Sequence, residues 1–246
     1  MADFLDDSIK RGDALIFTII TALSQADKAV FLELQNIVGS LHPGYCYLEV
    51  GSDRGGSIIA PLFDSRCGAL ISIDPRPEIQ RDERGVSFRF PENTTAKMLE
   101  ILAAAGVSQR ALARLRTFDT DISNLPFWRV GIKARLSFID AEHTNQAVFR
   151  DWLNVSRFIE RDSIVAFHDA NLIFDGLENI QSMLRHQGAC FSGYYLPDTI
   201  FVLALGAMAE EVTRGFGARS FDPVRFVATS RAALNAVIAR NVSLGR

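Results

Sequence analysis

The stretch Leu48-Glu49-Val50-Gly51-Ser52-Asp53-Arg54-Gly55-Gly56 decides the fold class of this chain. It begins inside a β-rich run at residues 45–50 and precedes an apolar run at residues 58–63, so it predicts a strand, a glycine turn and a helix. Glycine lets the backbone turn tightly and approach a ligand closely, because it has no Cβ. Asp53 stands where a dinucleotide-binding fingerprint has its second glycine. A carboxylate there would repel a pyrophosphate and favours a cationic ligand.

The alternation of strand and helix continues along the chain. Residues 5–40 have the spacing of two helices, and the apolar run at residues 15–23 is too short to span a membrane and predicts a packed helix. Further strands are predicted at residues 69–73, 115–118, 136–139 and 163–167, and further helices at residues 93–105, 146–159 and 177–186. This order predicts a doubly wound, mostly parallel sheet. The runs 189–196 and 199–205 are separated only by Pro197-Asp198, so they are expected to form an antiparallel hairpin.

Composition limits the classes of partner. Of the 246 residues, 48% are hydrophobic, and 26 Lys and Arg against 29 Asp and Glu give a net charge of -3. These values favour one α/β domain with short additions and a small-molecule partner, not nucleic acid or a membrane. The acidic N-terminal residues argue against an export signal. Cys46, Cys67 and Cys190 form no CxxC pair and are expected to be free thiols, which favours a cytoplasmic location.

Acidic residues lie at or just after the ends of five successive predicted strands: Glu49, Asp74, residues 119–121, Asp140 and Asp169. Ligands of open α/β sheets bind outside the carboxyl ends of the strands, so these residues are expected to lie around one cleft. Asp74, placed 23 residues after Gly51, can accept the ribose hydroxyls of a nucleoside ligand or begin a turn before Pro75. His143 and His168 would face the same cleft and could accept a proton from a hydroxyl group.

Residues 49–56, Ser72-Ile73-Asp74 and Phe138-Ile139-Asp140 together resemble the class I S-adenosylmethionine-dependent methyltransferases. Residues 138–144 and the later His168-Asp169 are similar to a small-molecule O-methyltransferase-like branch, which commonly shows Ile-Asp-Gly-Asp-His and a later His-Asp. The resemblance covers about residues 40–205. It implies a Rossmann-like, seven-stranded sheet whose last strand is antiparallel. We therefore expect a helical cap at residues 1–40, a methyltransferase domain at 41–206 and a helical appendage at 207–246, with its best helix at 230–240.

The resemblance also implies a role for each cofactor-binding residue. It places the methionine moiety of S-adenosylmethionine near the first loop, the ribose near Asp74, the adenine amine near Asp121, and the sulfonium and the methyl acceptor near Asp140. The first loop contributes Glu49, Gly51, Ser52, Asp53 and Gly55.

Activation of a hydroxyl acceptor is expected at Asp140, His143, His168 and Asp169, and two mechanisms are open. Two carboxylates in one cleft repel each other unless a cation lies between them, so Asp140, His168 and Asp169 are candidate ligands for magnesium or manganese. Alternatively, His143 or His168 acts as a general base without a metal. The sequence departs from the branch at Ala141 and Glu142. Asn171 stands one position after the site of the amide ligand in catechol-type relatives, which weighs against a metal.

The predicted function is therefore methyl transfer to a small molecule, at a hydroxyl oxygen. A non-catalytic S-adenosylmethionine-binding protein is one alternative, because one fold can serve unrelated functions. A nicotinamide-dependent oxidoreductase is another, which Asp53 disfavours. The N-terminal helices are compatible with two roles, packing against a partner in a homo-oligomer or forming a lid.

Overall fold

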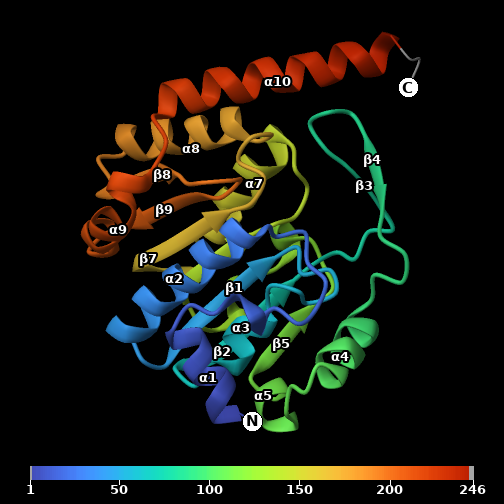
Figure 1. Ribbon diagram of the computed structural model, residues 1–246, viewed down its shortest axis with the longest axis vertical. Coiled ribbons are helices and arrows are strands. Elements are labelled where there is room, and N and C mark those ends of the chain that lie inside the picture. The colour runs from blue at the N-terminus through green and yellow to red at the C-terminus, as the bar shows by residue number, and fades with distance from the viewer. Residues whose placement is uncertain (1, 244–246) are drawn as a thin grey trace.

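A seven-stranded sheet with strand order β5-β2-β1-β6-β7-β9-β8 forms the centre of the computed structural model, which describes residues 2–243 (Figure 1). The strands are β1 (Tyr45–Val50), β2 (Cys67–Ile73), β5 (Leu115–Phe118), β6 (Ala134–Ile139), β7 (Ile159–Phe167), β8 (Phe191–Tyr195) and β9 (Phe201–Leu205). The β5-β2-β1-β6-β7 part is parallel, and β9 is antiparallel to both β7 and β8. This confirms the predicted fold class and the predicted C-terminal hairpin.

Helices cover both faces of the sheet, because successive side chains of each strand point to opposite sides. Tyr47 packs into one core and Leu48 into the other. The first core includes α1 (Ala2–Lys10), η1 (Ala14–Ile16), α2 (Gln25–Leu41), α3 (Ile59–Phe63), α4 (Thr95–Ala104), α5 (Gln109–Leu112) and α9 (Met208–Phe216). The second includes η2 (Ile122–Asn124), α6 (Phe127–Val130), α7 (Asn145–Val155), α8 (Phe174–His186) and α10 (Pro223–Ser243), while η3 (Gly217–Arg219) joins α9 to α10. The N-terminal helices therefore share a core with the sheet.

The apolar run at residues 15–23 is not the packed helix that the sequence predicted. Only Ala14–Ile16 is helical, as one 3-10 turn, and the Ile20 side chain is 90% exposed. Thr18, Ile19, Ile20 and Thr21 are all β-branched, which lowers helix propensity. The capping box of Ser24 and Asp27 then begins α2 at Gln25. The run is therefore an irregular segment.

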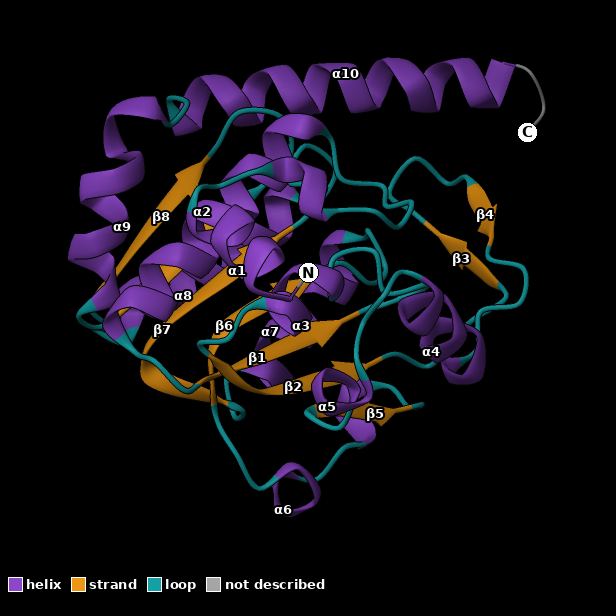
Figure 2. Cartoon of the chain, turned by 60° about the horizontal axis from the view of Figure 1, so that its bottom comes forward, coloured by secondary structure: helices purple, strands orange, loops and turns teal. Residues whose placement is uncertain are grey.

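A two-stranded hairpin, β3 (Ile79–Arg81) and β4 (Ser87–Arg89), was not predicted. It lies between β2 and α4 in the chain and stands apart from the main sheet (Figure 1). In Figure 2 the arrows of β1 and β2 point toward the side of the molecule on which this hairpin lies. The hairpin is therefore placed to cover a site at the strand ends. Helix α9 lies within the helical appendage predicted at residues 207–246, although its bounds were not predicted, and α10 is longer than the predicted helix at residues 230–240.

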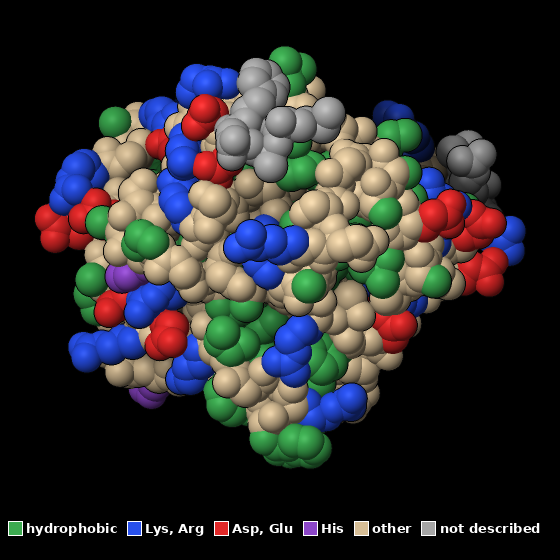
Figure 3. Space-filling view, turned by 90° about the horizontal axis from the view of Figure 1, so that it is seen from below, with side chains coloured by type: hydrophobic (Ala, Val, Ile, Leu, Met, Phe, Trp, Pro, Cys, Tyr) green, Lys and Arg blue, Asp and Glu red, His purple; other side chains and the backbone are tan. Residues whose placement is uncertain are grey.

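Charged and apolar side chains are mixed on the surface. On the face shown in Figure 3, Lys and Arg side chains are spread among hydrophobic and acidic ones and form no single basic patch. Within residues 2–243, no helix has both the length and the apolar character needed to cross a lipid bilayer.

Candidate active site at the carboxyl ends of the strands

Gly51 begins the turn that follows β1, and packing requires glycine at this position. Its φ is +86°, a conformation that residues with a Cβ rarely adopt. A Cβ on Gly51 would collide with the backbone oxygen of Asp140 and would lie 2.7 Å from the Cα of Ala141. The ends of β1 and β6 are in contact here, since the N–H of Asp140 donates to the carbonyl of Val50 at 2.9 Å. Close strand packing, and not ligand approach alone, therefore explains the glycine.

Asp74, the residue directly after β2, holds the glycine turn in place. One of its carboxylate oxygens accepts hydrogen bonds from the N–H groups of Ser52 at 3.0 Å and Asp53 at 2.9 Å. The other accepts from the N–H of Arg76 at 2.7 Å, and the guanidinium of Arg76 lies 3.5 Å from the carboxylate. Asp74 thus organises the loop in addition to any contact with a ribose.

A cavity of about 620 Å³ lies over the strand ends, a volume typical of a small-molecule site. Its walls come from the glycine turn, the end of β2, the segment at residues 20–22, the β3–β4 hairpin and the loops after β5, β6 and β7. The predicted site residues that line it are Gly51, Ser52, Asp53, Asp74, Asp121, Asp140, His143 and Asp169. Glu49, Gly55 and His168 do not line it.

Glu49 and Gly55 support the cavity from behind. Glu49 is fully buried, and its carboxyl group accepts hydrogen bonds from Ser57 at 2.7 Å and from the Tyr47 hydroxyl. Burial raises the pKa of Glu49 to about 8, although these two hydrogen bonds oppose the change. Gly55, with a φ of +80°, faces Met98 and Leu102. In this structure both residues therefore shape the turn from outside the cavity.

Asp121 lines the cavity and also caps η2. Its Oδ1 accepts hydrogen bonds from the N–H of Ser123 at 2.8 Å and the hydroxyl of Ser123 at 2.6 Å. Its Oδ2 lies 3.6 Å from the guanidinium of Arg150. Much of its hydrogen-bonding capacity is therefore used within the chain.

Asp140, His143, His168 and Asp169 come together at the ends of β6 and β7. Oδ1 of Asp140 lies 2.9 Å from Nε2 of His143 and 2.9 Å from Nδ1 of His168. Nδ1 of His143 lies 3.0 Å from Oδ2 of Asp169. Asp140 therefore bridges two imidazoles, and His143 bridges two carboxylates. We call these four residues the acid–histidine cluster.

The carboxylates keep both imidazoles protonated near neutral pH. Burial alone would lower the pKa of His143, but hydrogen bonds to Asp140 and Asp169 raise it to about 9. Burial also opposes the charged form of His168, whose pKa Asp140 and Asp27 raise to about 11. For Asp140, burial is outweighed by the two imidazoles, which hold the pKa of the carboxyl well below its usual range.

Asp27 extends the cluster to α2, and sequence reasoning missed it. Its Oδ2 lies 3.7 Å from Nε2 of His168, and the residue is 1% exposed. Its carboxylate also accepts hydrogen bonds from the N–H of Thr199 at 3.1 Å and the hydroxyl of Thr199 at 3.2 Å. In the sequence, the spacing of Ser24 and Asp27 indicates only a helix cap. The contact with His168 depends on tertiary packing.

The irregular segment at residues 20–22 is another part of the wall that was not predicted. Ile20, Thr21 and Ala22 line the cavity. A Cβ on Gly56 would lie 2.7 Å from the Cβ of Thr21, so the segment packs directly on the glycine turn.

The acid–histidine cluster contains ligand types that could hold a metal ion. Ligand atoms of Asp140, His143 and His168 all lie within 4.8 Å of one another. Asn171 does not line the cavity, and its Oδ1 is buried without a hydrogen-bond partner in the described part of the chain. The position directly after Asp169 is the buried Ala170. An ion here would be held by imidazole and carboxylate ligands, without the amide of catechol-type relatives.

Solved structures share this fold. The O-methyltransferase TomG from Streptomyces achromogenes, involved in tomaymycin synthesis and solved in complex with S-adenosylmethionine, is 12% identical, with a TM-score of 0.51 over 82% of this chain and 90% of that chain. Cofactor-bound Rv0187 from MTB is 15% identical, with a TM-score of 0.51 over 82% of this chain and 90% of that chain. No curated protein matches the sequence significantly.

A family model also matches the part of the chain that builds the site. The family, described as a methyltransferase domain, matches residues 48–170, which is half of the chain. The match begins within β1 and ends directly after Asp169, so it includes the glycine turn, Asp74 and the acid–histidine cluster. The chain belongs to this methyltransferase family and is a class I enzyme that depends on S-adenosylmethionine.

Proposed function

We propose that the chain methylates a hydroxyl oxygen of a small molecule. The observation that carries this proposal is the position of Asp140, His143 and Asp169 on the wall of the cavity that also includes the glycine turn. A hydroxyl acceptor must lose a proton as its oxygen becomes methylated, and carboxylates and imidazoles are the groups that take or relay protons. The cavity volume of about 620 Å³ suits a small ligand. TomG, an O-methyltransferase of the same fold, is consistent with oxygen as the acceptor atom.

The half of the cavity near the glycine turn would bind the cofactor. Bound S-adenosylmethionine supplies a methyl group on a cationic sulfonium. We place its methionine moiety along Gly51, Ser52 and Asp53, where a carboxylate suits a cation. The lone pairs of Asp74 that the loop does not use would accept ribose hydroxyls, and Asp121 would lie near the adenine. The main task of these residues is alignment, since methyl transfer is an in-line displacement.

Proton transfer from the acceptor is assigned to His143, with His168 as its support. His143 lines the cavity, whereas His168 is 3% exposed and lies behind Asp140. Because the pKa of His143 is raised to about 9, few molecules carry a neutral His143 near pH 7. A mechanism with His143 as the base therefore predicts a rate that increases with pH up to about 9.

The same residues fit a divalent cation. Asp140, His143 and His168 would hold it, since their ligand atoms lie within 4.8 Å of one another. Asp169, the other predicted ligand, lies outside this group, with its Oδ2 4.0 Å from Nδ1 of His168. When bound, the cation would lower the pKa of the acceptor hydroxyl. Imidazole ligands favour a softer ion than magnesium. Before it could bind the cation, each protonated imidazole would have to lose one proton.

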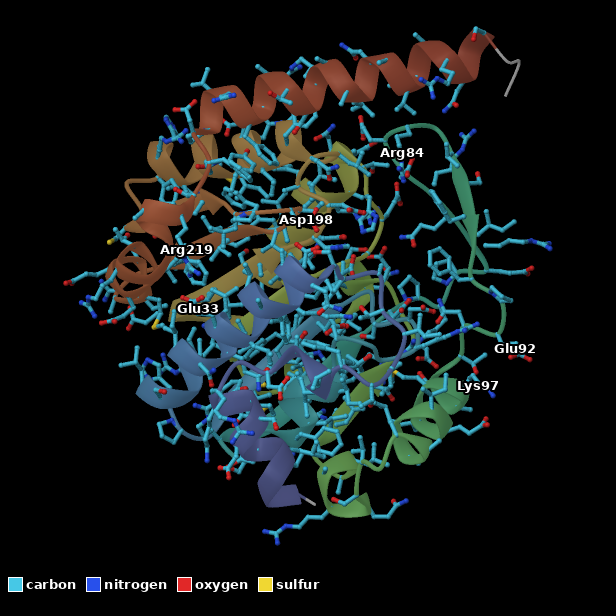
Figure 4. All side chains as sticks on the ribbon, viewed as in Figure 1. Glu33, Arg84, Glu92, Lys97, Asp198 and Arg219 are labelled. Atoms are coloured by element: carbon cyan, nitrogen blue, oxygen red, sulfur yellow. The ribbon has the colours of Figure 1, made fainter. Side chains whose placement is uncertain are left out.

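The test combines cofactor binding with turnover. Calorimetry should show binding of S-adenosylmethionine or its demethylated product with a Kd in the micromolar range, about -8 kcal/mol. Transfer of a labelled methyl group to a panel of phenols, amines and thiols then identifies the acceptor atom. Asp140→Ala should abolish transfer to the phenols. Glu33→Ala is the control, because Glu33 pairs with Arg219 on the outer surface of α2 (Figure 4). Transfer only to amines or thiols, or full activity of Asp140→Ala, would contradict the proposal.

Chelation separates the two ways of activating the hydroxyl. Activity that persists in excess chelator, with a rate that increases toward pH 9, assigns the proton to His143. Activity that disappears and is restored by one divalent ion assigns activation to the cation.

A further inference from the structure

Four arginines line the cavity, and two of them form no ion pair within residues 2–243. Arg84 pairs with Asp82, and Arg150 pairs with Asp121 and Asp151. Arg54 donates only to the carbonyl of Pro91, at 3.3 Å. Arg81 makes no hydrogen bond or ion pair within the described part of the chain. Arg81 therefore brings to the cavity a positive charge that forms no ion pair within the described residues, whereas the charge of Arg54 is partly offset by the neighbouring Asp53.

Large apolar side chains are exposed at the same mouth of the cavity. Ile20 from the irregular segment is 90% exposed, and Ile79 and Phe88 from the β3–β4 hairpin are 55% and 42% exposed. Exposed apolar side chains that gather around one cavity indicate a site for an apolar ligand surface. The mouth thus combines apolar contact area with the guanidinium of Arg81.

Hydrogen bonds tie the hairpin to the reactive end of the cavity. The N–H of Glu83, in the hairpin turn, donates to the carbonyl of His143 at 2.9 Å. The carboxylate of Glu83 accepts from the N–H of Asn145 at 2.9 Å, at the start of α7. On its other side, Asn241 of α10 donates to the carbonyl of Arg84 at 3.3 Å, at the end of the hairpin that lies below α10 (Figure 4). A ligand held by the hairpin is therefore placed beside His143.

The charges of the cavity also give such a ligand a direction. The carboxylates of Asp140 and Asp169 line the reactive end of the cavity, whereas Arg81 lines it from the β3–β4 hairpin. An anionic group is repelled by the carboxylates and attracted to the guanidinium of Arg81. Guanidinium groups bind carboxylates and phosphates with paired hydrogen bonds.

We propose that the β3–β4 hairpin and residues 20–22 form the acceptor subsite, and that the acceptor is an apolar hydroxyl compound with an anionic group bound by Arg81. The hydroxyl then points to the acid–histidine cluster and the anionic group to the mouth. This inference rests on the proposed function, because it assigns this half of the cavity to the acceptor. S-adenosylmethionine also has a carboxylate, so the experiment must separate the two anions.

The test is calorimetric binding of para-coumarate and para-coumaryl alcohol to the protein saturated with S-adenosylhomocysteine. These probes share a phenol and differ in the charge at the far end. Wild-type protein should prefer the carboxylate by about tenfold, which corresponds to about 1.4 kcal/mol. Arg81→Gln should remove this preference and leave the affinity for S-adenosylhomocysteine unchanged. Arg89→Gln is the matched control, because Arg89 lies on the same hairpin, pairs with Glu78 at 3.4 Å and does not line the cavity.

Three results overturn the inference. The first is wild-type protein that shows no preference for the carboxylate, including no binding of either probe. The second is Arg81→Gln protein that keeps the preference. The third is loss of S-adenosylhomocysteine affinity in Arg81→Gln, which would assign Arg81 to the cofactor. Wild-type protein that does not bind S-adenosylhomocysteine contradicts the cofactor assignment instead. A charge preference without methylation of any phenol contradicts only the proposed reaction.

Discussion

Replacing Asp74 by alanine tests whether this residue holds the glycine turn or only binds a ribose. Its carboxylate accepts hydrogen bonds from the N–H groups of Ser52, Asp53 and Arg76 and lies 3.5 Å from the guanidinium of Arg76. Asp74→Ala leaves these groups without their acceptor and removes one member of a buried ion pair. Such a change costs about 3–5 kcal/mol. The lower end applies here, because Arg76 also donates to the carbonyl of Asp53 and lies 3.6 Å from Asp119.

Asp74→Asn should cost less than Asp74→Ala. Asparagine keeps one carbonyl oxygen. If this oxygen takes the position of the Asp74 oxygen to which Ser52 and Asp53 donate, it can still accept both hydrogen bonds. It loses the negative charge opposite Arg76, and the expected cost is about 1–3 kcal/mol. Asp119→Ala is the control, since the Asp119 side chain is 56% exposed and its ion pair with Arg76 should contribute about 0–1 kcal/mol.

The assay is urea unfolding of the ligand-free proteins, followed by calorimetric titration with S-adenosylhomocysteine. Ligand-free stability should fall in the order wild type, Asp119→Ala, Asp74→Asn, Asp74→Ala. Cofactor affinity should fall by at least about tenfold in Asp74→Ala, since the loop that lines the site is no longer held. An Asp74→Ala protein that unfolds at the wild-type urea concentration, and in which only the cofactor affinity decreases, would contradict a role of Asp74 in holding the turn. Asp74 would then act on the ligand alone.

The contacts of Gly51, His143 and Glu83 predict the results of three further experiments. Gly51→Ala should lower the melting temperature even without ligand, because it adds backbone strain of about 1–3 kcal/mol and a collision with Asp140; an unchanged melting temperature would contradict the packing argument. In metal-free protein, the raised pKa of His143 stabilises the fold fully below pH 6.5, the ordinary pKa of histidine, and this contribution is lost as the pH rises through about 9. Urea unfolding at increasing pH should show this loss in the wild type and less of it in Asp140→Asn. Equal slopes of unfolding free energy against pH in the two proteins would contradict the contribution of His143. Glu83→Ala should speed tryptic cleavage after Arg81, because the N–H of Asn145 loses its acceptor on the hairpin. Glu83→Gln keeps an acceptor and should not change the cleavage rate. Equal cleavage rates in Glu83→Ala and the wild type would show that Glu83 does not hold the hairpin.

The parallel sheet and the residues at its strand ends were predictable because their signals are local and repeated. Residues 115–118 were predicted as a strand, and β5 has these same bounds. Parallel strands in one doubly wound sheet present their carboxyl ends at one edge, so topology alone brings Asp74, Asp140 and Asp169 to one cleft. The family resemblance added roles for these residues but not their internal contacts. That Asp74 binds the loop amides depends on the side-chain conformation, which no spacing rule gives.

The two elements that cover the cavity could not be predicted in the same way. Strands β3 and β4 have three residues each and are largely exposed, so they carry no alternation of apolar and polar residues. The apolar character of residues 15–23 comes from four side chains that are buried although their segment is irregular: Ile16, Phe17, Ile19 and Leu23. Ile20 instead faces the cavity and solvent. The apolar composition correctly predicted that this segment packs against the core, but the prediction that it forms a helix was wrong. Elements that close a site are short and lack periodicity, so the acceptor side was less predictable than the cofactor side.

Protons and a divalent ion compete for the same atoms of the acid–histidine cluster. In the metal-free protein the pKa values of about 9 for His143 and about 11 for His168 mean that both imidazoles hold their protons near pH 7. An ion bound through both imidazoles must displace two protons, so its affinity should increase by up to about 100-fold per pH unit below pH 9. An ion bound by Asp140 and Asp169 alone displaces none, because both carboxyl groups have lowered pKa values. Calorimetry with manganese in buffers of different ionisation enthalpy counts the protons released. Release of two protons would show that the imidazoles are ligands. Release of no proton, together with activity that still depends on the metal, would show that the histidines only orient the carboxylates.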